Sequence, residues 1–309
     1  MKKIIFIILI LFFFHTQTFS LENKIILKID NKIITEIDLL NEIKYLQALN
    51  PKLKNLNKYK MYEIAKASLI REKIKDIEIS KYTMKVNPKY IENVLKNIYS
   101  NIGFESKKEF LNYISNLNIE INTIEDKLSI EALWNNIIYD KFINKIKVDR
   151  EKILNDIKSN KNKGTSFNLY EILFNPKNID ESEEILKKIN NSIEENGFEN
   201  TASIFSISSS SKTGGKIGWI DESALSKKIL ENISHLKAGD YTDPILIPGG
   251  FLILYIKDKK IIERQIDFND TNLNKELSFR IRQLQNQQLN QYSNIYFNKI
   301  KKDILINEK

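Results

Sequence analysis

The sequence contains no cysteine among its 309 residues, and it is poor in glycine (nine), proline (five), histidine (two) and tryptophan (two). Without cysteine the chain can form no disulfide, can use no thiol in catalysis and can carry no lipid on a cysteine. Because glycine and proline are the residues that most often interrupt helices, their scarcity favours a helix-rich fold.

The charge is abundant and of mixed sign, with 48 lysines and arginines against 40 acidic residues and a formal net charge of +8. The lysines alternate with glutamates at helical spacing, which indicates solvated helix faces rather than a basic surface for nucleic acid. With 42% hydrophobic residues the composition is that of a globular protein. Its length suggests about two domains.

Residues 1–20 have the features of a secretory signal peptide. Lys2 and Lys3 precede an apolar run, Ile4–Phe14, and Thr18–Ser20 offers a cleavage site after Ser20. The apolar run is about half of the roughly 20 residues that span a bilayer, so an uncleaved membrane anchor is the alternative interpretation. We therefore expect an exported protein without a stable membrane span, and export argues against a role with nucleic acid.

The first half of the chain predicts a β-hairpin followed by helices. Asn23–Ile34 contains two β-branched runs around a turn, and Thr35 and Asp38 form a variant capping box that opens a helix to Leu49. Further helices are expected over Tyr59–Tyr82, from Asn87 and Pro88 to Gly103, from Ser106 onward, over Thr123–Ile146 and over Asp149–Ile157.

The second half mixes strands and helices. A polar linker, 158–165, precedes a strand, Phe167–Phe174, and a helix, Asp180–Glu195. The stretch Phe198–Ile256 then predicts a short helix, a serine-rich loop, a strand, an amphipathic helix and a final apolar strand. The last helix, Leu273–Ile306, carries an apolar stripe too broad to be stable alone, so we expect it to pack on the N-terminal helices.

The segment Asn168–Lys257 resembles a parvulin-type peptidyl-prolyl isomerase domain. The matching residues occur in the order of the family pattern: Glu171–Leu173, Asn196–Glu199, Ala202, Phe205, Ser206, Gly214, Gly215, Ile217–Trp219, Leu225, Ile229, Leu236–Asp240, Asp243–Ile245, Gly250 and Phe251. The hairpin, the helix start after it and the isolated last helix resemble SurA-type periplasmic chaperones. Because there is room for one parvulin domain, a PrsA-like or a shortened SurA-like arrangement is implied.

This resemblance implies an α+β fold with a periplasmic location. A mostly helical chaperone domain would combine residues 21–160 and 272–309. A parvulin-like domain, with a small antiparallel sheet wrapped by helices, would be inserted at 165–262.

The residues that carry catalysis in active parvulins are replaced. The two family histidines correspond to Glu171 and Leu252, and the Cys or Asp position corresponds to Ser208. The nearby hydroxyl and aromatic positions are Ile247 and Gly249. Leu252 can offer no hydrogen bond, and the charge of Glu171 would face electron-rich carbonyls. We therefore expect isomerase activity to be weak or absent.

The apolar lining of the family's groove is retained. By resemblance, Leu225 and Ile229 occupy the positions of the proline pocket, and Phe205, Phe251 and Leu252 could complete a substrate-binding groove. The alternative is that these side chains simply form the core, as apolar residues at helical spacing usually do. Trp219 is expected in the core, as is Trp134.

The remaining polar candidates carry no chemistry. Ser206–Ser211 lacks a neighbouring base, so we interpret it as a flexible loop. His15 lies in the signal, and His235 at a helix end has no assigned role. The carboxylates of Asp38, Glu42, Glu181, Glu183 and Glu184 are interpreted as helix-start and surface groups. They lack a partner histidine or a metal-ligand set, and no metal or cofactor is expected.

The sequence favours an exported, ATP-independent chaperone that binds unfolded or partly folded secretory or outer-membrane polypeptides. Two alternatives remain: an active prolyl isomerase, and an envelope-interaction protein built on a parvulin scaffold that no longer catalyses.

Overall fold

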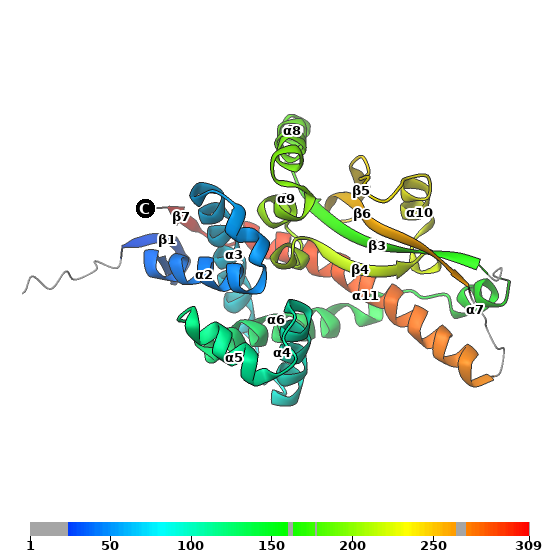
Figure 1. The fold of residues 1–309 in the computed structure, drawn as a ribbon, viewed down its shortest axis with the longest axis horizontal. Helices are drawn as coiled ribbons and strands as arrows, with labels where there is room; N and C mark the ends of the chain where they lie inside the picture. The colour runs from blue at the N-terminus through cyan, green and yellow to red at the C-terminus, as the bar shows by residue number, and fades with distance from the viewer. Residues whose placement is uncertain (1–23, 160–162, 177, 264–269, 309) are drawn as a thin grey trace, which may run out of the picture.

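The structure is a computed structural model that describes residues 24–159, 163–176, 178–263 and 270–308 (Figure 1). The predicted signal peptide, with His15, lies outside the described residues. Within the described ranges, no helix is both long enough and apolar enough to cross a membrane.

The chain begins with the predicted hairpin. Strands β1 (Ile25–Ile29) and β2 (Lys32–Thr35) pair antiparallel, and Asp30 turns the chain with a φ of 48°. Helix α2 (Glu36–Leu49) starts with the predicted capping box: the backbone N–H of Asp38 donates to the Thr35 hydroxyl, and the Asp38 carboxylate accepts from the backbone N–H of Thr35. A third strand, β7 (Ile306–Glu308), adds to β1 and was not predicted.

The next helices follow the predicted order. They are α3 (Lys58–Ile79), α4 (Pro88–Ile102), α5 (Lys107–Asn116), α6 (Ile121–Phe142) and α7 (Arg150–Ser159). The Asn87 side chain accepts from the first turn of α4, which ends at Gly103 with a φ of 101°. Trp134 is almost completely buried in their shared core, as predicted.

The long helix α11 (Asp270–Lys302) runs back beneath the sheet to the N-terminal helices, as Figure 1 shows. Tyr296 stacks on Trp134 with ring centroids 5.7 Å apart, and the Trp134 indole donates to the Ser293 hydroxyl at 2.8 Å. Nearer its start, Leu277 packs with Ile153 and other side chains of α7. The two ends of the chain thus share one core, and we call residues 24–159 and 270–308 the helical unit.

Between them lies a four-stranded sheet in the order β4-β3-β6-β5 with every neighbouring pair antiparallel. Its strands are β3 (Lys163–Phe174), β4 (Lys216–Asp221), β5 (Ile245–Ile247) and β6 (Gly250–Glu263). We call residues 163–176 and 178–263 the sheet unit. The predicted linker, 158–165, is wrong at both described ends, because α7 continues to Ser159 and β3 already pairs with β6 at Lys163.

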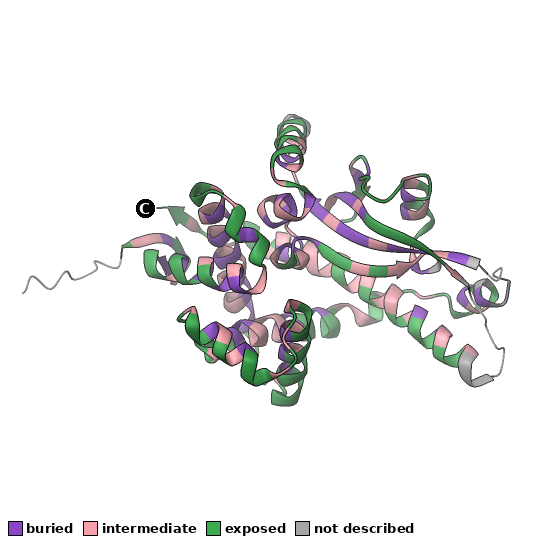
Figure 2. Ribbon diagram, in the orientation of Figure 1, coloured by how far each residue is buried: buried purple, intermediate pink, exposed green. Residues whose placement is uncertain are grey.

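Helices cover both faces of this sheet. One face packs against α8 (Ile179–Asn196) and α9 (Phe198–Phe205), and the other packs against α10 (Lys227–Ile233). Figure 2 shows the buried positions gathered along β3 and β6. The mostly helical α+β architecture with small antiparallel sheets is therefore confirmed.

Candidate functional site

A cavity of about 280 Å³ lies between the α10 side of the sheet and helix α11. Its apolar wall comes from the sheet, α10 and the turns around them: Leu169, Leu173, Ile217, Ile220, Ala224, Leu225, Ile229, Ile247, Leu252 and Leu254. Leu225, Ile229 and Leu252, which the sequence predicted for a groove, all line it. Glu171 and Ser208, at two of the family's catalytic positions, reach the same cavity.

Two residues of the predicted groove lie elsewhere. Phe251 stacks on Phe174 with ring centroids 5.6 Å apart, on the face that α8 and α9 cover. Phe205 ends α9 and joins the same cluster. Because successive side chains of a strand point to opposite faces, Phe251 and Leu252 cannot both face one groove. The structure thus places Phe205 and Phe251, both partly buried, against the core cluster under α8 and α9, and neither lines the cavity.

At the polar end of the cavity, Glu171 accepts two hydrogen bonds. The hydroxyls of Ser208 and Ser210 donate to the same carboxylate oxygen, Oε1, at 2.6 and 2.8 Å. Burial raises the pKa of Glu171 above its ordinary value, and the two hydroxyls oppose that rise because they stabilise the charged form. The position predicted to carry an unfavourable charge is therefore part of a hydrogen-bonded carboxylate–hydroxyl group.

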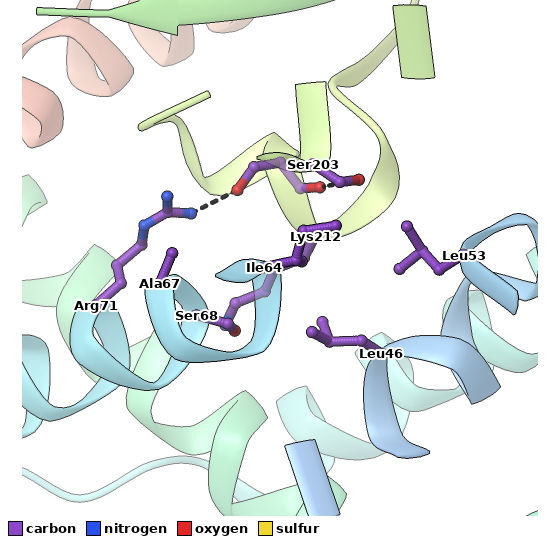
Figure 3. A pocket seen from close by; sticks show the side chains of 9 residues that line it. Leu46, Leu53, Ile64, Ala67, Ser68, Arg71, Ser203 and Lys212 are labelled. Atoms are coloured by element: carbon purple, nitrogen blue, oxygen red, sulfur yellow. Dashed lines mark hydrogen bonds between the residues drawn. The ribbon is translucent and has the colours of Figure 1, made fainter. Parts of the chain in front are cut away.

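The serine-rich segment, Ser206–Thr213, is ordered, which corrects its interpretation as a flexible loop. Ser206, Ser208 and Ser211 are buried, and a 3-10 turn begins at Ser209. Arg71 of α3 donates to the carbonyl oxygens of Ser206 at 2.9 Å and Ser208 at 3.0 Å, and to the Ser211 hydroxyl at 2.5 Å. Figure 3 shows Arg71 reaching from α3 toward this segment.

The same segment takes part in a partly buried ionic network. Glu131 of α6 binds Lys212 at 2.9 Å and Lys75 of α3 at 2.5 Å. Although burial alone would raise it, these two ammonium groups hold the pKa of Glu131 below its ordinary value. Burial lowers the pKa of Lys75 to about 8 against the attraction of Glu131. The helical unit therefore holds the segment that carries Ser208 and Ser210 through both Arg71 and Glu131.

The glycine pair that marks the family pattern has a steric role here. Gly215 has a φ of +79°, and a Cβ atom there would lie 2.3 Å from the carbonyl oxygen of Glu171. The Gly215 carbonyl accepts from the backbone N–H of Glu171 at 2.8 Å. Only glycine permits this approach, which places the start of β4 beside Glu171.

Several other predicted residues are placed differently. Trp219, expected in the core, is 41% exposed on β4, where the Lys260 ammonium lies 4.3 Å from its ring centroid. Glu42, expected at the surface, is buried and pairs with Lys127 at 2.7 Å. His235 is exposed. Among the described residues, no group of three acidic, histidine or cysteine side chains is arranged to hold a metal ion.

Sequence reasoning missed the second wall of the cavity, which consists of amide side chains from α11: Gln283, Asn286, Gln287, Asn290, Gln291 and Asn294. The signal was present, because these positions recur every three or four residues and therefore share one helix face. They lie beside the apolar stripe on which the prediction of this helix was based.

A family model describing the PPIC-type PPIASE domain matches residues 171–258. A comparison with curated proteins found no match. Among solved structures, a PpiC-type peptidyl-prolyl cis-trans isomerase domain is 25% identical and covers 33% of this chain and 96% of its own, with a TM-score of 0.29.

Two longer structures match most of the chain. PrsA from Bacillus subtilis is 20% identical and covers 91% of this chain and 92% of its own, with a TM-score of 0.28. A structure from the pair of SurA-like chaperones PEB4 and Cj1289 of Campylobacter jejuni is 17% identical. It covers 93% of this chain and 99% of its own, with a TM-score of 0.35. These are the two families that the sequence resembles. Residues 171–258, which include α8, α9, α10 and most of the sheet wall of the cavity, are thus similar to the PPIC-type PPIASE domain.

Proposed function

We propose that the protein is an exported chaperone that binds unfolded segments of secretory or outer-membrane proteins in the cavity of its parvulin-type domain. The helical unit serves as a second contact surface, and binding is reversible and requires no ATP. The observation that carries this proposal is the cavity itself. It keeps an apolar wall around Leu225, Ile229 and Leu252 although both family histidines are replaced.

The replacement of both family histidines, by Glu171 and Leu252, favours weak catalysis. Rotation about a peptide bond has a barrier of about 18–20 kcal/mol, and catalysis must stabilise the twisted amide. Leu252 has no polar atom to contribute. Glu171 is occupied by Ser208 and Ser210, and as a carboxylate it only accepts hydrogen bonds. Such a site favours holding a polypeptide over isomerising it.

An active prolyl isomerase is the second candidate. The observation that favours it is the hydrogen-bonded group of Glu171, Ser208 and Ser210. Burial raises the pKa of Glu171, which favours the protonated form of its carboxyl group. A protonated carboxyl could donate a hydrogen bond to a substrate, as a histidine can. Isomerisation of a proline peptide faster than the uncatalysed rate, and lost in Glu171→Gln with Ser208→Ala, would establish this function.

The chaperone function is tested by suppression of aggregation of a chemically unfolded client. Wild-type protein should suppress aggregation at near-stoichiometric amounts, and Leu225→Asn should weaken suppression several-fold because it places an amide in the apolar wall. The matched control is Leu246→Asn on β5, since Leu246 is 60% exposed and does not line the cavity. No suppression by the wild type would reject the chaperone. Equal effects of the two variants would reject the cavity as its site.

A further inference from the structure

The amide wall of α11 is uniform in chemistry over its whole length. The face formed by Gln283, Asn286, Gln287, Asn290, Gln291 and Asn294, which we call the amide face, points into the cavity. Its first and last members are eleven residues apart in sequence, which corresponds to about 16 Å along a helix. Opposite it, the parvulin-type domain supplies the apolar wall.

These amides are not used within the described structure. None of the six side chains forms a hydrogen bond to another described residue, whereas Gln288, on another face of α11, exchanges two with the backbone of Lys147. The Oε1 atom of Gln283 is buried and has no hydrogen-bond partner. A buried acceptor without a donor costs free energy, so this atom has a free lone pair for a donor that enters the cavity.

The chemistry of the cavity selects its ligand. Each Asn or Gln side chain offers both an acceptor and a donor pair, the same groups that a polypeptide main chain offers in complementary form. Glu171 is the one ionisable side chain among the described residues that line the cavity, and its carboxylate is already bonded to two serines. The cavity therefore lacks the charges that would recognise a phosphate, a nucleic acid or an acidic ligand.

We propose that the amide face binds the main chain of an extended polypeptide segment while the apolar wall takes its side chains. This inference rests on the proposed chaperone function and adds how the client is recognised. An extended chain rises about 3.3 Å per residue, so the 16 Å face accommodates about five residues. Because main-chain groups are common to all sequences, this wall gives affinity with little sequence preference.

The test uses the full chain and a fluorescent, unstructured peptide containing leucine and proline, with binding followed by anisotropy. Gln287→Ala with Asn290→Ala should weaken binding about thirty-fold, since each of the two lost hydrogen bonds contributes roughly 1 kcal/mol. Alanine retains helix propensity without adding a large apolar surface. Gln285→Ala is the matched control, because Gln285 lies on the same helix but does not line the cavity.

A second peptide, methylated on alternate main-chain nitrogens, identifies the groups that are recognised. Methylation removes N–H donors, so it should weaken binding to the wild type several-fold but change binding to the double variant much less. If the wild type and the double variant bind the unmodified peptide equally, or methylation weakens both alike, the amide face is not the recognition surface and the chaperone proposal stands. If the wild type binds no peptide, both proposals fail.

Discussion

Glu171 shows how a single carboxylate is held at the cavity. The parvulin pattern that the sequence resembles has a histidine at this position, and here two serine hydroxyls bind the glutamate. Both serine hydroxyls donate to one oxygen, so a neutral amide could accept the same two bonds. What distinguishes glutamate from glutamine here is therefore the charge rather than the hydrogen bonds.

This charge makes stability depend on pH. Because burial raises the pKa of Glu171, the folded protein binds more protons there than the unfolded chain, and stability falls as pH rises through that raised value. Glu171→Gln has no ionisable group at this position, so it should not lose stability as pH rises. We expect its melting temperature to exceed that of the wild type at about pH 7 and the difference to shrink towards about pH 4.5, near the ordinary glutamate pKa.

Thermal melts across this pH range provide the measurement. Glu183→Gln, at an exposed position on α8, is the control for loss of a negative charge. A difference that grows as pH falls would contradict a raised pKa for Glu171.

The residue scale also explains which residues of the predicted groove line one cavity. Leu225 and Ile229 lie four apart on the chain, and both reach the cavity. Phe251 and Leu252 are adjacent on β6. Because successive side chains of a strand point to opposite faces, only one of them can face the cavity. The helical spacing of the amide face is also present in the sequence. It was missed because asparagine and glutamine side chains are neither apolar, nor catalytic, nor typical metal ligands.

At the scale of elements, the serine-rich segment owes its order to a residue far away in the sequence. Arg71 satisfies two carbonyl oxygens and one hydroxyl of Ser206–Thr213. A run of serines predicts a loop because it has no apolar pattern. The residue that holds the segment in place, Arg71, lies on α3 and is not visible in this run. The order of this segment could not be predicted from its own composition.

Removing that residue should loosen the segment. Arg71→Ala leaves two carbonyl oxygens without their donor and should lower the free energy of unfolding by about 2–4 kcal/mol. Arg71→Lys retains one charged donor group, so its free energy of unfolding should fall by less than that of Arg71→Ala. Urea unfolding measures the effect, and hydrogen exchange at Ser208–Ser211 should speed up. The control is Arg150→Ala at the exposed start of α7, and an equal loss there would contradict the assignment.

Elements set by local signals were predicted well, and those set by distant partners were not. The capping box of Thr35 and the left-handed end at Gly103 depend on neighbours within a few residues. Strand β7 has three residues and exists because β1, at the other end of the chain, offers it a free edge. The start of β3 at Lys163 likewise depends on pairing with Glu263.

At the scale of the whole molecule, partly buried and exposed ionic contacts join the two units. Lys212 of the sheet unit shares the partly buried Glu131 with Lys75, whereas Lys60 of α3 reaches Glu195 of α8 at the surface. A buried ion pair adds little net stability when it forms, but breaking one leaves an uncompensated charge. The Glu131 contact should therefore decide whether the units unfold together.

Glu131→Gln tests this coupling. It leaves the buried ammonium group of Lys75 and the partly buried one of Lys212 without their carboxylate, which should cost about 3–5 kcal/mol. We expect the wild type to unfold in one calorimetric transition and Glu131→Gln in two, because the sheet unit loses its ionic contact with α6. Glu195→Gln, at a surface contact between the units, should leave one transition, since its ion pair with Lys60 is largely exposed.

The pH dependence of the stability of Glu131→Gln distinguishes two causes of its destabilisation: an unpaired buried charge and a loss of packing. The pKa of Lys75 is about 8 in the wild type, below the ordinary lysine value, because burial disfavours its charge. Without Glu131 the charge is disfavoured further, so the ammonium should lose its proton more readily. A lysine whose pKa is lower in the folded than in the unfolded protein stabilises folding as pH rises through the folded value. The stability deficit of Glu131→Gln relative to the wild type should therefore shrink as pH rises through the variant's lowered Lys75 pKa towards about 8, where the wild-type Lys75 also loses its proton. A deficit that stays constant over this range would show that the variant is destabilised by packing and that Lys75 remains charged.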